Sequence, residues 1–172
     1  MALSKIDAAN FLDGTLPDTN INNASLDNVT TLPAGVGGKV LQVVTATDGT
    51  GLSSSSTSYI DTGLSASITP SSSSNKVLVI VTTGTHGVDT ATGAGLSLKL
   101  ERVSTDLIVQ SSWGSHPTIT YIYGQGYCFN YLDSPSSTSS TTYKLQYKSN
   151  DGTNFVLENA STAVMTLLEV SA

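Results

Sequence analysis

The chain has 172 residues, enough for one domain with its own core and a short additional segment. Charged residues make up only 12%, about half the usual share, with seven Lys and Arg against thirteen Asp and Glu. The basic residues are scattered singly, which excludes the basic footprint of a nucleic-acid-binding protein, and the longest apolar run, Val77 to Val81, is too short to cross a bilayer.

Two features of the chain bear on the localisation of the protein and on how its fold is stabilised. Met1 to Lys5 carries one positive charge with no apolar stretch behind it, so we expect no secretion signal. Cys128 is the single cysteine, which excludes an intrachain disulfide. We therefore expect packing or oligomerisation to hold the fold together.

Residues 1–37 have a different pattern from the rest. Apolar side chains recur every five positions at Phe11, Leu16, Ile21 and Leu26, which resembles the pentapeptide-repeat pattern. The repeats amount to about one coil, and repeat architectures need several units to bury a core. We predict an extended N-terminal arm that anchors the protein. A plain linker, and an arm ordered only by docking on a partner or on its own copies, are both open alternatives.

A β domain is predicted over residues 38–172. The glycine- and proline-rich segment before it disfavours both helix and strand, which marks the boundary. Clusters of serine, glycine and aspartate separate short runs rich in β-branched and aromatic residues. About ten short strands and no candidate helix predict an all-β fold, an antiparallel, jelly-roll-like β-sandwich. The runs cover residues 40–47, 57–61, 64–69, 76–83, 95–102, 107–110, 119–123, 127–132, 142–148, 154–157 and 163–170.

Some of these strands are expected to have one side exposed to solvent. Leu96, Leu98 and Leu100 alternate with polar residues, as do the aromatic and apolar residues of 142–148. In 76–83 and 163–170, by contrast, both sides are apolar, and such strands need a second cover in a small antiparallel domain. We expect sister copies to supply it, with a strand in the middle of a thick single-chain core as the alternative. The expected interface residues are Val77, Val79, Val81, Leu167 and Val170.

Residues suited to catalysis or metal binding lack the context they need. His86 and His116 are the only histidines, both in predicted loops, and no second ligand lies at a metal-binding spacing. Asp48, Asp133 and Asp151 are expected in turns, so paired carboxylates for glycoside hydrolysis are a minor alternative. We expect no enzyme activity, no metal and no cofactor.

Aromatic residues crowd into one stretch. From Tyr121 to Tyr131 they take odd positions, with Gly124 to Gly126 expected as a bend inside one long strand. Buried, they would build the core or a subunit interface, which is favoured; exposed, they would stack on sugar rings. Trp113, in the predicted loop 111–115, is the best candidate for an exposed contact. The candidate ligand-binding residues are Trp113, Tyr121 and Tyr123.

A family resemblance runs through the β domain. Successive blocks, including GKVLQVV from Gly38, SYIDTGL from Ser58, NKVLV from Asn75 and FNYLDSP from Phe129, resemble a domain of tail-fibre-like and other structural proteins of bacteriophages, notably those of marine bacteria and cyanobacteria. TTYKLQ from Thr141 and MTLLEV from Met165 continue the order, so the resemblance covers about residues 38–172. It implies a virion component, a homotrimer without cofactor and without a defined ligand site.

In long fibres this kind of domain ends a large polypeptide, whereas here it follows directly on residues 1–37. We therefore expect a separately made fibre tip, a head fibre or a capsid decoration protein. It would be made in the host cytoplasm and assembled on the particle. Its partners would be its own copies and the capsid, portal or tail proteins. The alternative is a carbohydrate-binding tip that recognises host surface glycans.

Overall fold

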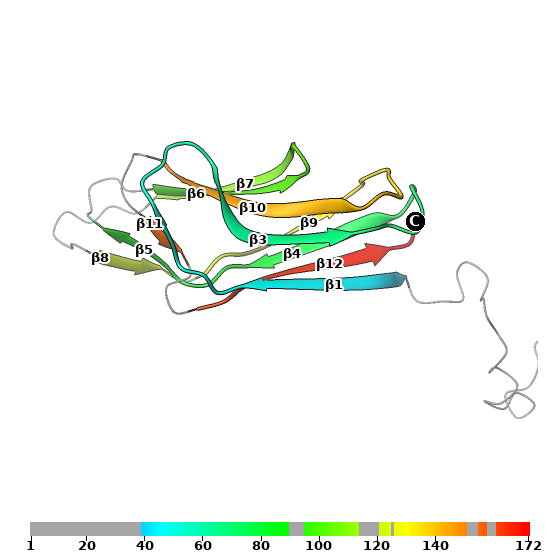
Figure 1. Ribbon diagram of the computed structural model, residues 1–172, viewed down its shortest axis with the longest axis horizontal. Helices are drawn as coiled ribbons and strands as arrows, with labels where there is room; N and C mark the ends of the chain where they lie inside the picture. The colour runs from blue at the N-terminus through cyan, green and yellow to red at the C-terminus, as the bar shows by residue number, and fades with distance from the viewer. Residues whose placement is uncertain (1–38, 90–94, 114–120, 125, 151–154, 158–160) are drawn as a thin grey trace, which may run out of the picture. The chain divides into compact units, whose positions relative to one another are not determined.

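The computed structural model describes residues 39–89, 95–113, 121–124, 126–150, 155–157 and 161–172 (Figure 1). The predicted arm, with Phe11, Leu16, Ile21 and Leu26, lies outside these residues. Within them the chain forms twelve strands and no helix. The strands are β1 (Val40–Asp48), β2 (Leu52–Ser54), β3 (Ile60–Ile68), β4 (Lys76–Thr82), β5 (His86–Asp89), β6 (Gly95–Arg102), β7 (Thr105–Trp113), β8 (Tyr121–Gly124), β9 (Cys128–Asp133), β10 (Thr141–Ser149), β11 (Phe155–Leu157) and β12 (Ala163–Val170).

These strands form three antiparallel four-stranded sheets. The first sheet has the order β1-β12-β4-β9 and the second sheet the order β3-β10-β6-β7. They form the lower and upper layers of a sandwich in Figure 1. The small sheet, with the order β2-β11-β5-β8, is built from much shorter strands.

The order in which the chain visits the two large sheets is that of a jelly roll. From β1 in the first sheet the chain passes to β3 in the second, returns to β4, and crosses again to β6. β6 and β7 form a hairpin, after which β9, β10 and β12 alternate between the sheets. Because all connections but one cross between sheets, the eight strands wrap around one core. The predicted all-β, jelly-roll-like sandwich is confirmed.

The small sheet closes one end of the sandwich. Each of its strands lies in a connection between two long strands: β2 follows β1, β5 follows β4, β8 follows β7 and β11 follows β10. These four connections leave the sandwich at the same end, where Figure 1 shows β5, β8 and β11 together. The C-terminus and Lys39 lie at the other end, where the Ser171 backbone N–H donates to the Lys39 carbonyl at 2.8 Å.

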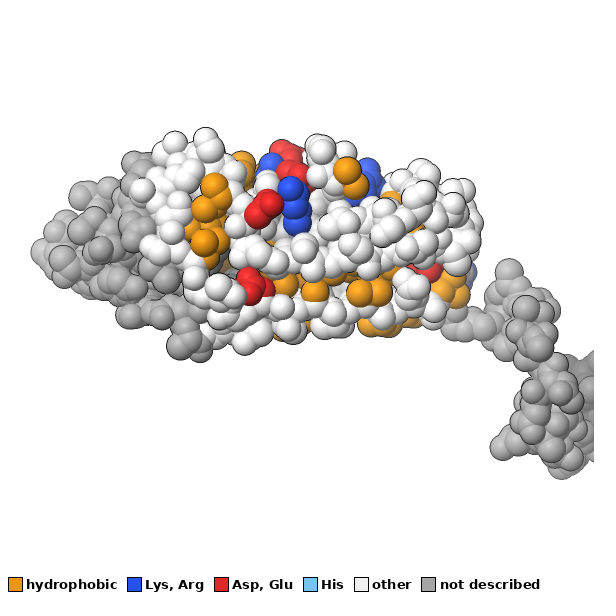
Figure 2. Space-filling model, in the orientation of Figure 1, with side chains coloured by type: hydrophobic (Ala, Val, Ile, Leu, Met, Phe, Trp, Pro, Cys, Tyr) orange, Lys and Arg blue, Asp and Glu red, His pale blue; other side chains and the backbone are white. Residues whose placement is uncertain are grey.

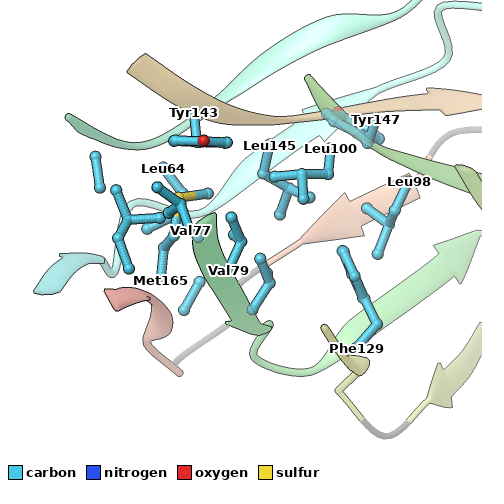
Figure 3. Close-up of a cluster of buried hydrophobic side chains, with 14 of the residues drawn as sticks. Leu64, Val77, Val79, Leu98, Leu100, Phe129, Tyr143, Leu145, Tyr147 and Met165 are labelled. Atoms are coloured by element: carbon cyan, nitrogen blue, oxygen red, sulfur yellow. The ribbon is translucent and has the colours of Figure 1, made fainter. Parts of the chain in front are cut away.

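The core is filled by alternate residues of the facing sheets, whose side chains meet in Figure 3. Val77, Val79 and Val81 of β4 and Leu167 of β12 are each 0% exposed within a single chain. The expectation that these four side chains form a subunit interface is therefore wrong, because the second sheet covers them. The core partners are Leu64, Ala66, Ile68, Leu96, Leu98, Leu100, Phe129, Tyr143, Leu145, Tyr147, Ala163 and Met165.

Strand β3 joins two segments that the sequence predicts as separate strands. It carries an irregularity between Asp61 and Ser65, where its pairing with β10 shifts. Gly63 in this bulge has a φ of +98°, a conformation that only glycine adopts without strain. A Cβ there would lie 2.7 Å from a carboxylate oxygen of Asp48. The positive φ is thus what requires glycine in the bulge, whereas the Asp48 carboxylate could move away from a Cβ.

The predicted bend at Gly124 to Gly126 is instead a change of sheet. β8 ends at Gly124 in the small sheet, and β9 begins at Cys128 in the first sheet. A Cβ on Gly126 would lie 2.1 Å from the backbone oxygen of Thr83, so no other residue fits without moving the backbone. The Tyr127 backbone N–H donates to the Thr83 Oγ1 at 2.8 Å, which holds this crossing in place.

Polar alternation is confirmed in β10 but differs in β6. In β10, Tyr143, Leu145 and Tyr147 are buried while the residues between them are half-buried. In β6 the side expected to face water is closed, since Lys99 is 9% and Glu101 8% exposed. On this side Lys99 contacts Glu101, Asp106 of β7 and the ring of Tyr59, and Glu101 contacts Lys144 of β10.

Candidate interaction surfaces

The outward side of the first sheet carries a continuous apolar row. Strand pairing places Val43 opposite Leu168, Leu168 opposite Leu78, and Leu78 opposite Leu132, so the row crosses all four strands. Its ends are the most open, because Val43 is 58% and Leu132 51% exposed, while the two central leucines are half-buried. Side chains in directly opposed positions are close enough to pack together.

Further apolar residues extend this row on both sides. We call the apolar face the set of hydrophobic side chains on the outward side of the first sheet. Figure 2 shows hydrophobic side chains along the lower layer, where β1 lies. The members are Val40, Val43, Leu78, Ile80, Leu132, Val164, Leu168 and Val170.

The outward side of the second sheet is charged. The Lys99 Nζ lies 3.1 Å from the Glu101 Oε2 and 2.9 Å from the Asp106 Oδ1. The Lys144 Nζ lies 3.4 Å from the Glu101 Oε1 and 3.5 Å from the Asp61 Oδ1. Figure 2 shows this group as neighbouring blue and red side chains on the upper layer. We call these five residues the charged face.

The charged face satisfies its own charges. Burial acts to lower the pKa of Lys99, but hydrogen bonds to Asp106 and Glu101 outweigh it, so this pKa lies above its ordinary value. The Lys99 Nζ also lies 4.6 Å from the centre of the Tyr59 ring, a cation–π contact. The lysines therefore stay protonated at neutral pH and hold the acidic groups in pairs, which leaves these groups in a structural role.

A small hollow lies beside the bulge of β3, at the edge of the charged face. It is lined by Asp61, Gly63, Ser65, Thr142 and Lys144, together with two core leucines. The Gln146 Nε2 donates to the Asp61 Oδ1 at 2.5 Å, and the Lys144 Nζ approaches the same oxygen. The carboxylate in this hollow is thus already engaged by the protein.

Two buried carboxylates tie the ends of strands together. Asp133, expected in a turn, is the last residue of β9 and is 4% exposed; it accepts hydrogen bonds from Arg102 and from the Tyr143 Oη. Glu169 of β12 is 1% exposed, and its Oε1 accepts hydrogen bonds from Ser71 and Asn75 in the β3–β4 turn. Burial raises the pKa of Tyr143, and the bond to Asp133 adds to this.

His86 and Asp48 take structural places. His86 lies on β5 rather than in a loop, and its ring stacks on Tyr127 with centroids 5.0 Å apart. Asp48 caps a turn as expected, because its Oδ1 accepts from the Thr50 backbone N–H. His116 and Asp151 lie outside the described residues. Among those described, no group of three or more His, Cys, Asp or Glu is arranged to hold a metal ion.

The candidate sugar-binding aromatics belong to strands at the small-sheet end. Trp113, expected in a loop, is the last residue of β7 and pairs with Gly95. Tyr121 and Tyr123 lie on β8, the edge strand of the small sheet. The structure describes these three residues by their backbone alone. The other aromatics, Tyr127, Phe129 and Tyr131, pack in or against the core, as favoured by the sequence.

The sequence predicted only some members of the apolar face. Val170, a predicted interface residue, does lie on it, as do Leu78 and Leu168 from the same two-sided runs. Val43 and Leu132 are not among the interface residues predicted from the sequence, although each alternates with core residues along its strand. Only the strand order reveals them. Val43 becomes a neighbour of Leu168, and Leu132 a neighbour of Leu78, because β12 and β4 lie between β1 and β9.

Taken together, the strand order and the two contrasting outer faces define a jelly-roll domain with one charged and one apolar side. No known family model matches the sequence, and no curated protein matches it. Among solved structures, the chain is similar to VP2 of infectious bursal disease virus in its subviral particle, with 14% identity and a TM-score of 0.40, covering 76% of this chain and 38% of that one.

A chain of the T13 particle of infectious bursal disease virus is similar as well. It shares 16% identity with a TM-score of 0.42, over 76% of this chain and 36% of the viral chain. The chain therefore matches little more than a third of the length of these viral proteins. The described part of the chain contains no helix that is long and apolar enough to span a membrane.

Proposed function

We propose that the chain is a structural protein of a bacteriophage virion, a homotrimeric appendage such as a fibre tip, a head fibre or a capsid decoration protein. The observation that carries the proposal is the jelly-roll strand order, an architecture used by viral capsid and lectin domains. It falls in the same residues, 38–172, whose sequence blocks resemble phage structural proteins. Residues 1–37 are the anchoring arm of the proposal, with capsid, portal or tail proteins as partners.

The use of ionisable groups supports a structural role over an enzymatic one. Catalytic acids and bases are held near a cleft with their charges available to a substrate. Here Glu101, Asp106 and Asp133 are engaged by lysine or arginine, and Glu169 holds a turn. The proposed function therefore works by self-association and surface contact.

The placement of the chain ends supports an appendage. Strand β1, with which the described domain begins, starts at the end opposite the small sheet (Figure 1). The small sheet is therefore the end of the domain opposite the point at which residues 1–38 join it, which suits a domain attached through those residues.

Imaging of intact phage particles tests this function. Particles of the phage that encodes the chain are reconstructed with and without an antibody fragment against residues 39–172. The particles with the fragment should show bound antibody at a fixed vertex, collar or tail position. Particles from a deletion mutant, which serve as the matched control, should lose both the antibody and the corresponding density. A chain that is absent from purified particles would contradict the proposal.

A carbohydrate-binding tip is the second candidate. It is favoured by the placement of Tyr121 and Tyr123 on β8, the edge strand of the small sheet, because aromatic rings can stack on sugars. Binding of the domain to a glycan array, with loss of binding in Trp113→Ala or Tyr123→Ala, would support it. Tyr59→Ala is the matched control, since Tyr59 contacts lysines of the second sheet. Absence of binding to host-surface glycans would contradict it.

A further inference from the structure

We propose that the apolar face is the surface on which a second copy of this chain sits. This inference rests on the proposed function, since it names the face through which the appendage self-associates. It differs from the interface expected from the sequence, because the valines of β4 that point inward are already covered by the chain's own second sheet.

Charge is the first argument. Four rows of outward side chains cross the first sheet, and Lys76 is the only charged member of these rows. The remaining positions hold the apolar face together with Thr45, Thr47, Thr82, Thr166, Asn130 and Cys128. A neighbouring copy can therefore cover this face while burying few charges, which a face rich in lysine or glutamate would not allow.

Exposure is the second argument. The large apolar side chains stay most open at the two edges of the sheet, where Val43 is 58%, Val40 50% and Leu132 51% exposed. A flat apolar surface of this width, on a protein with few charges, is typical of an interface between proteins. The charged face offers no comparable surface, because its groups satisfy one another across β6 and β10.

Area is the third argument. With strands about 4.8 Å apart and alternate residues about 6.7 Å apart along each, four strands and four rows span about 500 Å². Covering it buries about 500 Å² on this face and a similar area on the copy that covers it, about 1,000 Å² in total, which is the least expected of a biological interface. A second copy therefore covers the whole face, whereas a single extended peptide would cover the width of one or two strands.

The decisive variants place a carboxylate on the open ends of the apolar row. Val43→Asp and Leu132→Asp change side chains that are exposed in a single copy, so each variant should still fold. In the oligomer each would bury an unpaired charge in the interface. We expect the mass in solution to fall to that of one chain, with self-association weakened about 100-fold or more. The matched control is Val109→Asp on β7, where a valine 49% exposed on the other sheet is changed in the same way. It should keep the native mass.

Cys128 supplies a second readout on the native chain. Its thiol is exposed on the outward side of β9 in a single copy, in the same row as Thr82. In the oligomer we expect thiol reagents to react with it slowly, and in Leu132→Asp to react as fast as with a free thiol. If the native chain is oligomeric but the two variants keep its mass and Cys128 reacts freely, the assignment of this face is overturned while the proposed function stands. A native chain that is a monomer overturns the self-association on which both rest.

Discussion

Arg102 and Asp133 join the two large sheets at the end away from the small sheet. The Arg102 Nη1, on β6, donates to both oxygens of the Asp133 carboxylate on β9, at 2.7 and 2.6 Å. The Tyr143 Oη, on β10, donates to the same carboxylate at 2.7 Å. Two strands of the second sheet are thereby fixed to the edge strand of the first.

Removing this carboxylate should destabilise the domain strongly. Asp133→Ala leaves a partly buried guanidinium and a buried hydroxyl without their shared acceptor, and we expect the free energy of unfolding to fall by about 3 kcal/mol or more. Denaturant titration measures this change. The control is Asp61→Ala on the charged face, where the carboxylate is mostly exposed, and its unfolding midpoint should stay almost unchanged. Equal effects of the two variants would contradict the structural role of Asp133.

Glu169 should make stability depend on pH in the acidic range. Burial acts to raise its pKa, but hydrogen bonds from Ser71 and Asn75 outweigh burial and lower the pKa below 4.5 in the folded chain. A lowered folded pKa means that the contribution is fully present above about pH 4.5 and is lost as the pH falls through the folded value.

Comparison with Glu169→Gln isolates this contribution. The variant keeps an acceptor oxygen but no charge, so we expect a loss of about 1 to 2 kcal/mol at neutral pH. The difference between the two proteins should shrink as the pH is lowered below 4.5, measured by urea unfolding at a series of pH values. A difference that stays constant down to pH 2 would count against the hydrogen-bonded carboxylate.

Adjacent leucines on β12 should behave in opposite ways. Leu167 is 0% exposed in the core, so Leu167→Ala should cost about 2 to 5 kcal/mol of folding free energy. Leu168 belongs to the apolar face, and Leu168→Thr should change the folding of a single copy by less than about 1 kcal/mol while weakening self-association. Thermal unfolding combined with mass measurement separates the two effects. Loss of folding in Leu168→Thr alone would show that the sides of β12 have been exchanged.

Val103 occupies a strained position in the hairpin between β6 and β7. Its φ is +55°, which is unfavourable for a β-branched residue, and the side chain is 64% exposed. Two-residue hairpin turns favour glycine or asparagine at such a position. We expect Val103→Gly to raise the free energy of unfolding by about 1 kcal/mol, seen as a higher melting temperature. A lower melting temperature would mean that the valine contributes contacts beyond its strain.

The sequence predicted the long strands well because their apolar pattern and their turns agree. β6 and β12 have the predicted bounds, and the alternation of β10 assigns its buried side correctly. β2 and β5 were missed, since a serine-rich segment and a His-Gly pair have little intrinsic preference for strands. In the small sheet these two strands pair with β11 on its two sides, and β5 also pairs with β8.

The apolar face could be predicted only in part. A run such as Val77 to Val81 shows that both sides of a strand avoid water, but periodicity does not say which side faces the chain's own second sheet. That choice depends on β3, β10 and β6, which are distant in sequence and pack only after folding. The inward residues Val77, Val79, Val81 and Leu167 were therefore assigned to a partner, although they build the core.

The mass of the full native chain in solution tests the central claim most directly. An oligomer of three copies has three times the single-chain mass of 17.8 kDa, which light scattering coupled to size exclusion measures without reference to shape. We predict this threefold mass, maintained on dilution and lost in Leu132→Asp. A native chain that has the mass of a single copy at every concentration would contradict a protein that works by associating with itself.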